Sequence, residues 1–279
     1  MTHIQPRRIG SVEFRVVCQG WAPLELSDEC PGREVDWGEE RRRHSWAFGE
    51  GADWRWHVHA ISVRMPWGVA MVDTGLGVHP PVGPWADGEG LLAGDAYERA
   101  QVDPAEVSLV VLTHMHPDHV GGVLDGADPR FANARYLLHE ADRSYAELPD
   151  LSVYTVRSRP DLRRLEALGV LELDPDDREV APGIEVMHTP GHTPGHRSVI
   201  VDTGEANVLL TGDLLHLPIQ IAHPDWPSNH DVDAQEAARS RTTAVNRARE
   251  EEWTVGIHHF TRPWGTVTSD GWSSLADRA

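Results

Sequence analysis

One short segment constrains this chain more than any other, the run Thr113–His119 with the sequence T-H-M-H-P-D-H. It follows directly on an apolar run, Val107–Leu112, which predicts a buried strand. Side chains alternate along an extended chain, so His114 and His116 point the same way and can hold one metal ion together. A proline then turns the chain. After this turn come two more ligand-type residues, Asp118 and His119, whose side chains can reach the space next to His114 and His116.

Three further motifs place ligand-type side chains at the ends of predicted strands. They are Thr189–His196, with two Pro-Gly turns before His192 and His196; Leu210–Asp213; and Ile257–Phe260, with His258 and His259. Each motif alone is weak, because a single strand-end carboxylate is more often a cap than a ligand. Together, in this order, they predict a metal centre built from imidazoles and carboxylates.

Composition limits the partners that such a centre can serve. The 279 residues are 40% hydrophobic and 25% charged, with a formal net charge of −19. That charge disfavours nucleic acid and anionic membranes, and we read the one basic run, Arg41–Arg43, as a solvated face. Two cysteines, Cys18 and Cys30, cannot form a disulfide-rich scaffold. With no apolar leader or membrane-spanning run, we expect a cytoplasmic protein with free thiols and a small-molecule substrate.

Hydrophobic patterning predicts runs of strands with helices between them. Expected strands are Ser11–Val17, His57–Arg64, Val69–Val72, Val107–Leu112, Arg135–Leu138, Gly183–Met187, Arg197–Asp202, Val208–Thr211 and Trp253–Ile257. Expected helices are Asp95–Gln101, His139–Glu147, Asp161–Leu168 and Asp233–Glu252. This order predicts a layered α/β protein with mixed sheets. We expect one domain over 1–279, with about 20–54 forming a cap or insert.

With these motifs in place, the chain resembles the metallo-β-lactamase superfamily of hydrolases, from Val69–Gly75 to the final histidine pair. The resemblance implies a four-layer αββα sandwich with two metal ions at the sheet edge. The implied ligands are His114, His116 and His196 for the first ion, Asp118, His119 and His259 for the second, and Asp213 as the bridge. The alternative to His259 is His258. We expect His192 to be a turn residue, and Asp73 to hold a ligand imidazole in one tautomer.

Within the superfamily, the chain is similar to the branch of N-acyl homoserine lactonases and methyl parathion hydrolase. The similarity lies in the Trp-rich stretch Phe14–Trp85, the run Gly212–Gln220 and the ending His259–Pro263. True β-lactamases carry an export signal and often a cysteine at position 213, and neither is present here. By analogy with similar lactonases, a homodimer is possible.

The resemblance implies a dinuclear hydrolase in which a metal-bridging hydroxide cleaves a lactone or a carboxylic ester with an apolar portion. Alternatives are a phosphotriester or thioester hydrolase, a mono-iron persulfide dioxygenase, and a non-catalytic binding protein. Zn²⁺ is the first expectation for the metal, with Mn, Fe, Co or Ni also compatible. His216 either contacts the substrate and assists the leaving group or is a hydrogen-bonded loop residue. Candidates for an apolar acyl pocket, with core packing as the alternative, are Trp21, Trp46, Trp226 and Trp264.

Overall fold

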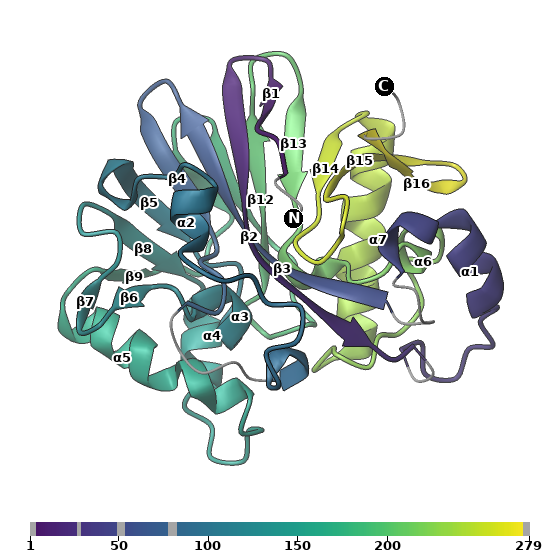
Figure 1. The fold of residues 1–279 in the computed structure, drawn as a ribbon, viewed down its shortest axis with the longest axis horizontal. Helices are drawn as coiled ribbons and strands as arrows, with labels where there is room; N and C mark the ends of the chain where they lie inside the picture. Colours follow the sequence, from purple (N-terminus) through teal and green to yellow (C-terminus); the bar gives the residue numbers. More distant parts are fainter. Residues whose placement is uncertain (1–3, 27–28, 49–53, 78–82, 276–279) are drawn as a thin grey trace.

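The fold is described from a computed structural model, which covers residues 4–26, 29–48, 54–77 and 83–275. Two seven-stranded sheets form its centre, and the helices lie outside them (Figure 1). Within these ranges, no helix combines the length and apolar character needed to cross a bilayer.

The first sheet has the strand order β1-β2-β3-β4-β5-β8-β9 and is mixed. Strands β1 to β4 pair antiparallel, whereas β4, β5, β8 and β9 pair parallel. The bounds are β1 (Arg7–Ile9), β2 (Val12–Leu24), β3 (Trp54–Met65), β4 (Gly68–Val72), β5 (Val107–Val111), β8 (Arg135–Leu138) and β9 (Leu171–Leu173). A short separate hairpin joins β6 (Leu124–Asp125) to β7 (Asp128–Pro129).

The second sheet follows the order of the sequence, from β10 to β16. All neighbours pair antiparallel except β13 and β14, which are parallel. The bounds are β10 (Arg178–Ala181), β11 (Ile184–His188), β12 (Arg197–Asp202), β13 (Asn207–Leu210), β14 (Thr254–Gly256), β15 (Trp264–Thr268) and β16 (Gly271–Ser274).

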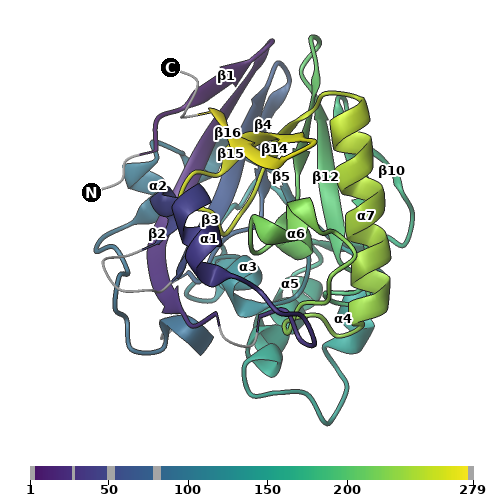
Figure 2. The same ribbon diagram turned by 90° about the vertical axis from the view of Figure 1, so that its right-hand side faces the viewer.

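Helices cover the outer faces of the two sheets, so the architecture is the four-layer αββα sandwich that the resemblance implied (Figures 1 and 2). On the first sheet lie α2 (Ala96–Arg99), α3 (Pro117–Val120), α4 (Glu140–Tyr145) and α5 (Arg159–Ala167). On the side of the second sheet lie α1 (Trp37–Arg43), α6 (Ile219–Ala222) and α7 (Ala234–Glu250). The mixed sheets that the sequence predicted are present, and the helix predicted over Asp233–Glu252 is present as α7.

The core between the sheets is built by the alternation of side chains along β2 and β3. Phe14 and Val63 are register partners, and so are Val16 and Ile61, and all four are buried in one cluster. The second sheet supplies the opposing side chains of this cluster, among them Val199 and Val201. Each fully buried aliphatic or aromatic side chain contributes roughly 1.5–3 kcal/mol, so this row alone fixes the sheet register.

Strand β2 is longer than the sequence predicted, because its alternation is interrupted but its pairing is not. A bulge between Cys18 and Gly20 shifts the register, and the ladder with β3 then continues to Leu24. Gly20 has φ +125°, and a Cβ there would lie 2.4 Å from the carbonyl oxygen of Gly90. The excursion predicted for about 20–54 therefore begins after Leu24. Residues 27–28 and 49–53 of that stretch lie outside the described ranges.

Candidate metal centre

Four loops converge where strands of both sheets end, and they carry all four predicted motifs. The loop after β5 carries the T-H-M-H-P-D-H segment, and the loop after β11 carries the two Pro-Gly-His turns. The turn after β13 presents Asp213, and the turn after β14 presents His259. Rigid strands from two sheets thus fix the loops that hold the chemistry, an arrangement typical of functional sites.

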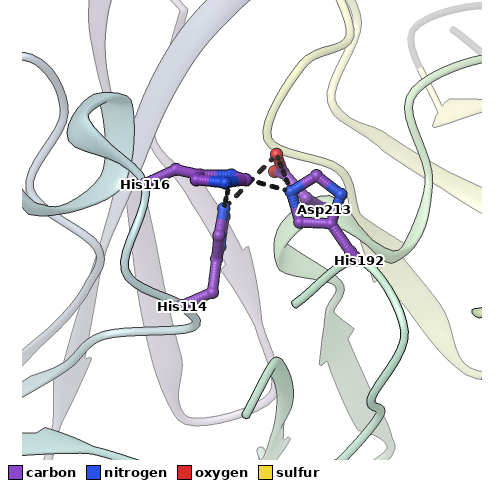
Figure 3. A group of neighbouring side chains, drawn as sticks. All are labelled: His114, His116, His192 and Asp213. Carbon is purple, nitrogen blue, oxygen red and sulfur yellow. Dashed lines mark hydrogen bonds and ion pairs between the residues drawn. The ribbon is translucent and has the colours of Figure 1, made fainter. Parts of the chain in front are cut away.

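A first group of ligand atoms consists of three imidazoles and one carboxylate (Figure 3). His116 Nδ1 lies 3.0 Å from His114 Nε2 and 3.0 Å from His192 Nε2. The carboxylate oxygen Oδ2 of Asp213 lies 3.4 Å from His192 Nε2 and 3.7 Å from His114 Nε2. Burial lowers the pKa of His114 well below its usual value and that of His116 to about 3. These two rings are therefore neutral and can offer lone pairs to a cation.

A second group lies beside the first and uses the other oxygen of the same aspartate. Asp213 Oδ1 lies 3.0 Å from His119 Nε2 and 2.9 Å from His259 Nε2. Asp118 Oδ2 lies 3.3 Å from His119 Nε2 and 3.8 Å from His259 Nε2. Asp213 therefore faces both groups, as expected of a carboxylate that bridges two ions.

The residues fit divalent cations, because buried polar atoms in the second group face one another without aligned hydrogen bonds. Among the described residues, none forms such a bond to His119 Nε2, His259 Nε2 or Asp213 Oδ1. Leaving buried polar groups unsatisfied is costly, and a cation between nitrogen and carboxylate donors removes that cost. The two His/Asp groups thus have the donor chemistry of divalent-metal sites.

In the second group, hydrogen bonds behind the two imidazole rings hold them with Nε2 toward the carboxylates. His119 Nδ1–H donates to Asp73 Oδ2 over 2.7 Å, and His259 Nδ1–H donates to the carbonyl oxygen of His57 over 2.6 Å. Asp73 also accepts from the backbone N–H and the hydroxyl of Thr113. It adopts φ +61°, an unusual backbone conformation for a residue other than glycine. The predicted role of Asp73 matches this geometry, in which each ring keeps its Nε2 free for a ligand.

The electrostatics of the second group favour a positive charge at its centre. Burial opposes protonation of His119, but Asp213, Asp118 and Asp73 outweigh it and raise the pKa of His119 well above its usual value. Burial likewise opposes ionisation of Asp118, yet the charge of His119 holds the pKa of this carboxyl below its usual range. Without an ion, a proton on His119 supplies the charge that a divalent cation would otherwise bring.

The structure places His196, a predicted ligand of the first ion, outside the two groups of ligand atoms, and it places His192 in the first group. His196 Nε2 accepts the backbone N–H of Asp213 over 2.9 Å, and its Nδ1 lies 3.0 Å from the carbonyl oxygen of Thr189. Both ring nitrogens are thus used inside the protein, so His196 has no lone pair left for an ion. It instead supports the turn that carries Asp213, while the His192 ring belongs to the first group.

The other predicted site residues divide between the centre and its surroundings. His259, preferred over His258, lies in the second group, whereas His258 Nε2 lies 3.4 Å from Asp73 Oδ2, behind it. His216 is 1% exposed, and its Nε2 lies 3.2 Å from Asp213 Oδ2. Its ring stacks on that of His259. These contacts fit the alternative in which His216 is a hydrogen-bonded loop residue.

A cavity of about 280 Å³ opens over the two groups. The ligand side chains that line it are His116, Asp118, His192 and Asp213. Its wall is partly apolar, and the side chains that form it include Trp56, Pro84, Tyr154 and Val232. None of the four tryptophans predicted for an acyl pocket lines this cavity. Trp264 packs edge-on against Phe14 in the core, and Trp46 packs against Trp54 and Phe260.

Two further residues of the site were missed by sequence reasoning. The hydroxyl of Tyr154 donates a short hydrogen bond to Asp118 Oδ1, and burial raises the pKa of Tyr154 well above its usual value. Asp142, on α4, accepts from the backbone N–H of Met115 and of Gly195 and from the hydroxyl of Thr193. It therefore joins the two histidine-bearing loops. Neither residue lies in a motif, so the sequence held no local signal for it.

Comparison with known proteins agrees with this geometry. A family model described as the metallo-beta-lactamase superfamily matches residues 55–255. The chain belongs to this superfamily. Its curated relatives include an N-acyl homoserine lactonase of Bacillus sp, 30% identical over 42% of this chain and 42% of that protein. Another is the N-acyl homoserine lactonase AttM of Azorhizobium caulinodans, 29% identical over 58% of this chain and 66% of that protein. The chain thus matches less than two thirds of the length of these relatives.

Solved structures share the superfamily fold over nearly the whole chain. The hydrolase AbOPH superposes with a TM-score of 0.78, 18% identity and coverage of 97% of this chain and 96% of the other. AidC, a dizinc quorum-quenching lactonase, superposes with a TM-score of 0.77, 19% identity and the same coverage. At these identities the likeness establishes the metallo-beta-lactamase fold.

Proposed function

We propose that this metallo-beta-lactamase chain is a dinuclear metal-dependent hydrolase that opens lactones or cleaves carboxylic esters with an apolar portion. The observation that carries the proposal is Asp213, whose two oxygens face two separate groups of nitrogen and oxygen ligands. A mono-iron dioxygenase would need only one such group. A binding protein with a decayed centre would not need to keep both.

The proposed ligands of the first ion are His114, His116 and His192, and those of the second are Asp118, His119 and His259, with Asp213 shared. Zn²⁺ suits this mixture of imidazole and carboxylate. Two divalent ions in one site supply a nucleophile from water at neutral pH and polarise the oxygen of the scissile bond.

The residues of the chain orient the substrate and exclude water. Trp56 and Val232 are apolar side chains of the cavity wall, suited to an acyl chain, and the same cavity is lined by ligand side chains of both groups. The Tyr154 hydroxyl remains protonated and can donate a hydrogen bond at the edge of the site. The lactonase activity named for the curated relatives supports a lactone as the first substrate class to test.

The direct test is hydrolysis by the metal-loaded protein of a panel of lactones, carboxylic esters, thioesters and phosphotriesters. We expect turnover of lactones or esters, and Asp118→Asn should lower kcat/KM by roughly a hundredfold or more because it removes an anionic ligand. The matched control is Asp125→Asn, an exposed aspartate on β6. Full activity in Asp118→Asn would refute the proposed centre. Turnover confined to thioesters or phosphotriesters would contradict the proposed substrate class of lactones and carboxylic esters.

Two properties of the whole protein remain predictions. We propose a cytoplasmic location, where buried cysteines without a disulfide, such as Cys18 and Cys30, are typical. A homodimer is expected by analogy with similar lactonases, and sedimentation of the purified protein would test it.

A further inference from the structure

A second cluster of metal-ligand side chains lies on the paired strands β2 and β3. Cys18 and His59 are register partners across the antiparallel ladder, and His57 is two residues before His59 on the same face. All three side chains are buried, with His57 2% exposed and His59 1% exposed. They continue the row that faces the second sheet, beyond the apolar pair Val16 and Ile61.

The polar atoms of this cluster converge, yet most of them lack hydrogen bonds. One ligand atom from each side chain lies within 4.8 Å of the other two. The Cys18 Sγ atom is 3.7 Å from His57 Nδ1, and the centroids of the His57 and His59 rings are 5.1 Å apart. Among the described residues, none forms a hydrogen bond to His57 Nε2 or to either ring nitrogen of His59. Two buried imidazoles with three unsatisfied nitrogens are unusual in a protein interior.

The dinuclear centre does not account for these side chains. Among the described residues, the hydrogen bonds between the two sites involve the backbone of His57: its carbonyl oxygen accepts from His259 Nδ1–H, and its N–H donates to the carbonyl oxygen of His259. Burial lowers the pKa of His59 well below its usual value, so its ring is neutral and has a lone pair to donate. Burial also raises the pKa of Cys18 to about 11, so the thiol loses its proton only if a cation binds it.

We propose that Cys18, His57 and His59 form a separate site for a thiophilic divalent cation of the Zn²⁺ class. One thiolate and two imidazoles are ligands that Zn²⁺ prefers, and three such ligands leave one position of a tetrahedral ion open. Binding would transfer the thiol proton to solvent and would use one nitrogen of each imidazole. The ion would pin β2 to β3 directly beside the carbonyl group that orients His259.

Cobalt substitution tests this site separately from the proposed hydrolase centre. Because the dinuclear centre contains only nitrogen and oxygen ligands, a thiolate-to-Co²⁺ charge-transfer band in the near ultraviolet can arise only from a cysteine. The protein is produced in cobalt-supplemented, zinc-depleted medium so that buried sites fill during folding. We expect this band in the full chain, together with about one more cobalt per chain than in Cys18→Ser.

Matched variants assign the band. Cys18→Ser should abolish it, and Cys30→Ser, which changes the other buried cysteine, should retain it. A cobalt-loaded protein without the band would overturn the proposal, and so would a band that survives Cys18→Ser or disappears in Cys30→Ser. If Cys18→Ser does not fold, the spectrum of the unmodified chain and of Cys30→Ser still decides. Loss of hydrolysis in Asp118→Asn leaves the band unchanged, so the two proposals fail independently.

Discussion

His192 and His196 each follow a Pro-Gly pair, but the atoms around the two imidazoles differ. His192 Nε2 faces the first ligand group, whereas His196 holds the backbone of Asp213. His192→Ala should lose one metal equivalent and change the free energy of unfolding of the metal-free protein less than His196→Ala does, because no backbone N–H loses its acceptor. His196→Ala should lower that free energy by roughly 2–4 kcal/mol, because it leaves a cavity and an unpaired backbone N–H. Elemental analysis and urea unfolding of both variants measure this contrast, and the reverse pattern would restore His196 as the ligand.

The residue types of the centre could be predicted from the sequence, but the choice between these two histidines could not. Four ligand types within six residues after a buried strand are a local signal, and they lie in the groups that the structure shows. The placement of His192 in the ligand group depends instead on the backbone N–H of Asp213, which occupies the Nε2 atom of His196 from 17 residues further along the chain. Local sequence carries no record of such a long-range bond.

Tyr154 gives a second prediction about a single residue of the site. Its hydroxyl donates to Asp118 and it lines the cavity, so Tyr154→Phe removes a hydrogen bond to a charged group. Such bonds contribute about 1.5–3 kcal/mol, and we therefore expect kcat/KM to fall by roughly tenfold to a hundredfold. Tyr145→Phe, on α4 and outside the cavity, is the control. Unchanged kcat/KM in Tyr154→Phe would show that the bond has no part in turnover.

Helices and strands with a regular pattern of apolar side chains were predictable from the sequence. Segments that are strands only because they pair with a neighbouring strand were not. The strand Arg135–Leu138 and the helix after Asp233 were predicted closely, the helix because Asp233 caps the N–H groups of Gln235 and Glu236. The second half of β2 was missed, because the bulge at Cys18–Gly20 breaks the alternation that a sequence displays. Its pairing with β3 restores the strand in the folded protein.

Helix α4 supplies the third prediction, through Asp142. Burial raises the pKa of Asp142 to about 6, so at neutral pH it is ionised and accepts three hydrogen bonds from the two histidine-bearing loops. Asp142→Ala should lower the free energy of unfolding by about 3 kcal/mol, since it leaves buried donors unpaired. Asp150→Ala, an exposed aspartate nearby, should change it by less than about 0.5 kcal/mol. Equal effects in urea unfolding would mean that Asp142 does not join the loops.

For the whole molecule, the binding of metal should be linked to pH through His119. Its pKa is raised in the metal-free protein by the surrounding carboxylates, so an ion must displace its proton at neutral pH. Metal affinity should therefore fall as the pH is lowered, by roughly tenfold per pH unit for each proton displaced. Competition with a chelator across the neutral range measures this slope. An affinity independent of pH would show that His119 is unprotonated before metal binds.

The central claim, a two-ion centre bridged by Asp213, is tested most directly by anomalous diffraction at the absorption edge of the metal found in the purified protein. The account predicts one peak among His114, His116 and His192 and a second among Asp118, His119 and His259, with Asp213 between them. A single peak, or a peak bound by His196 instead of His192, would contradict it.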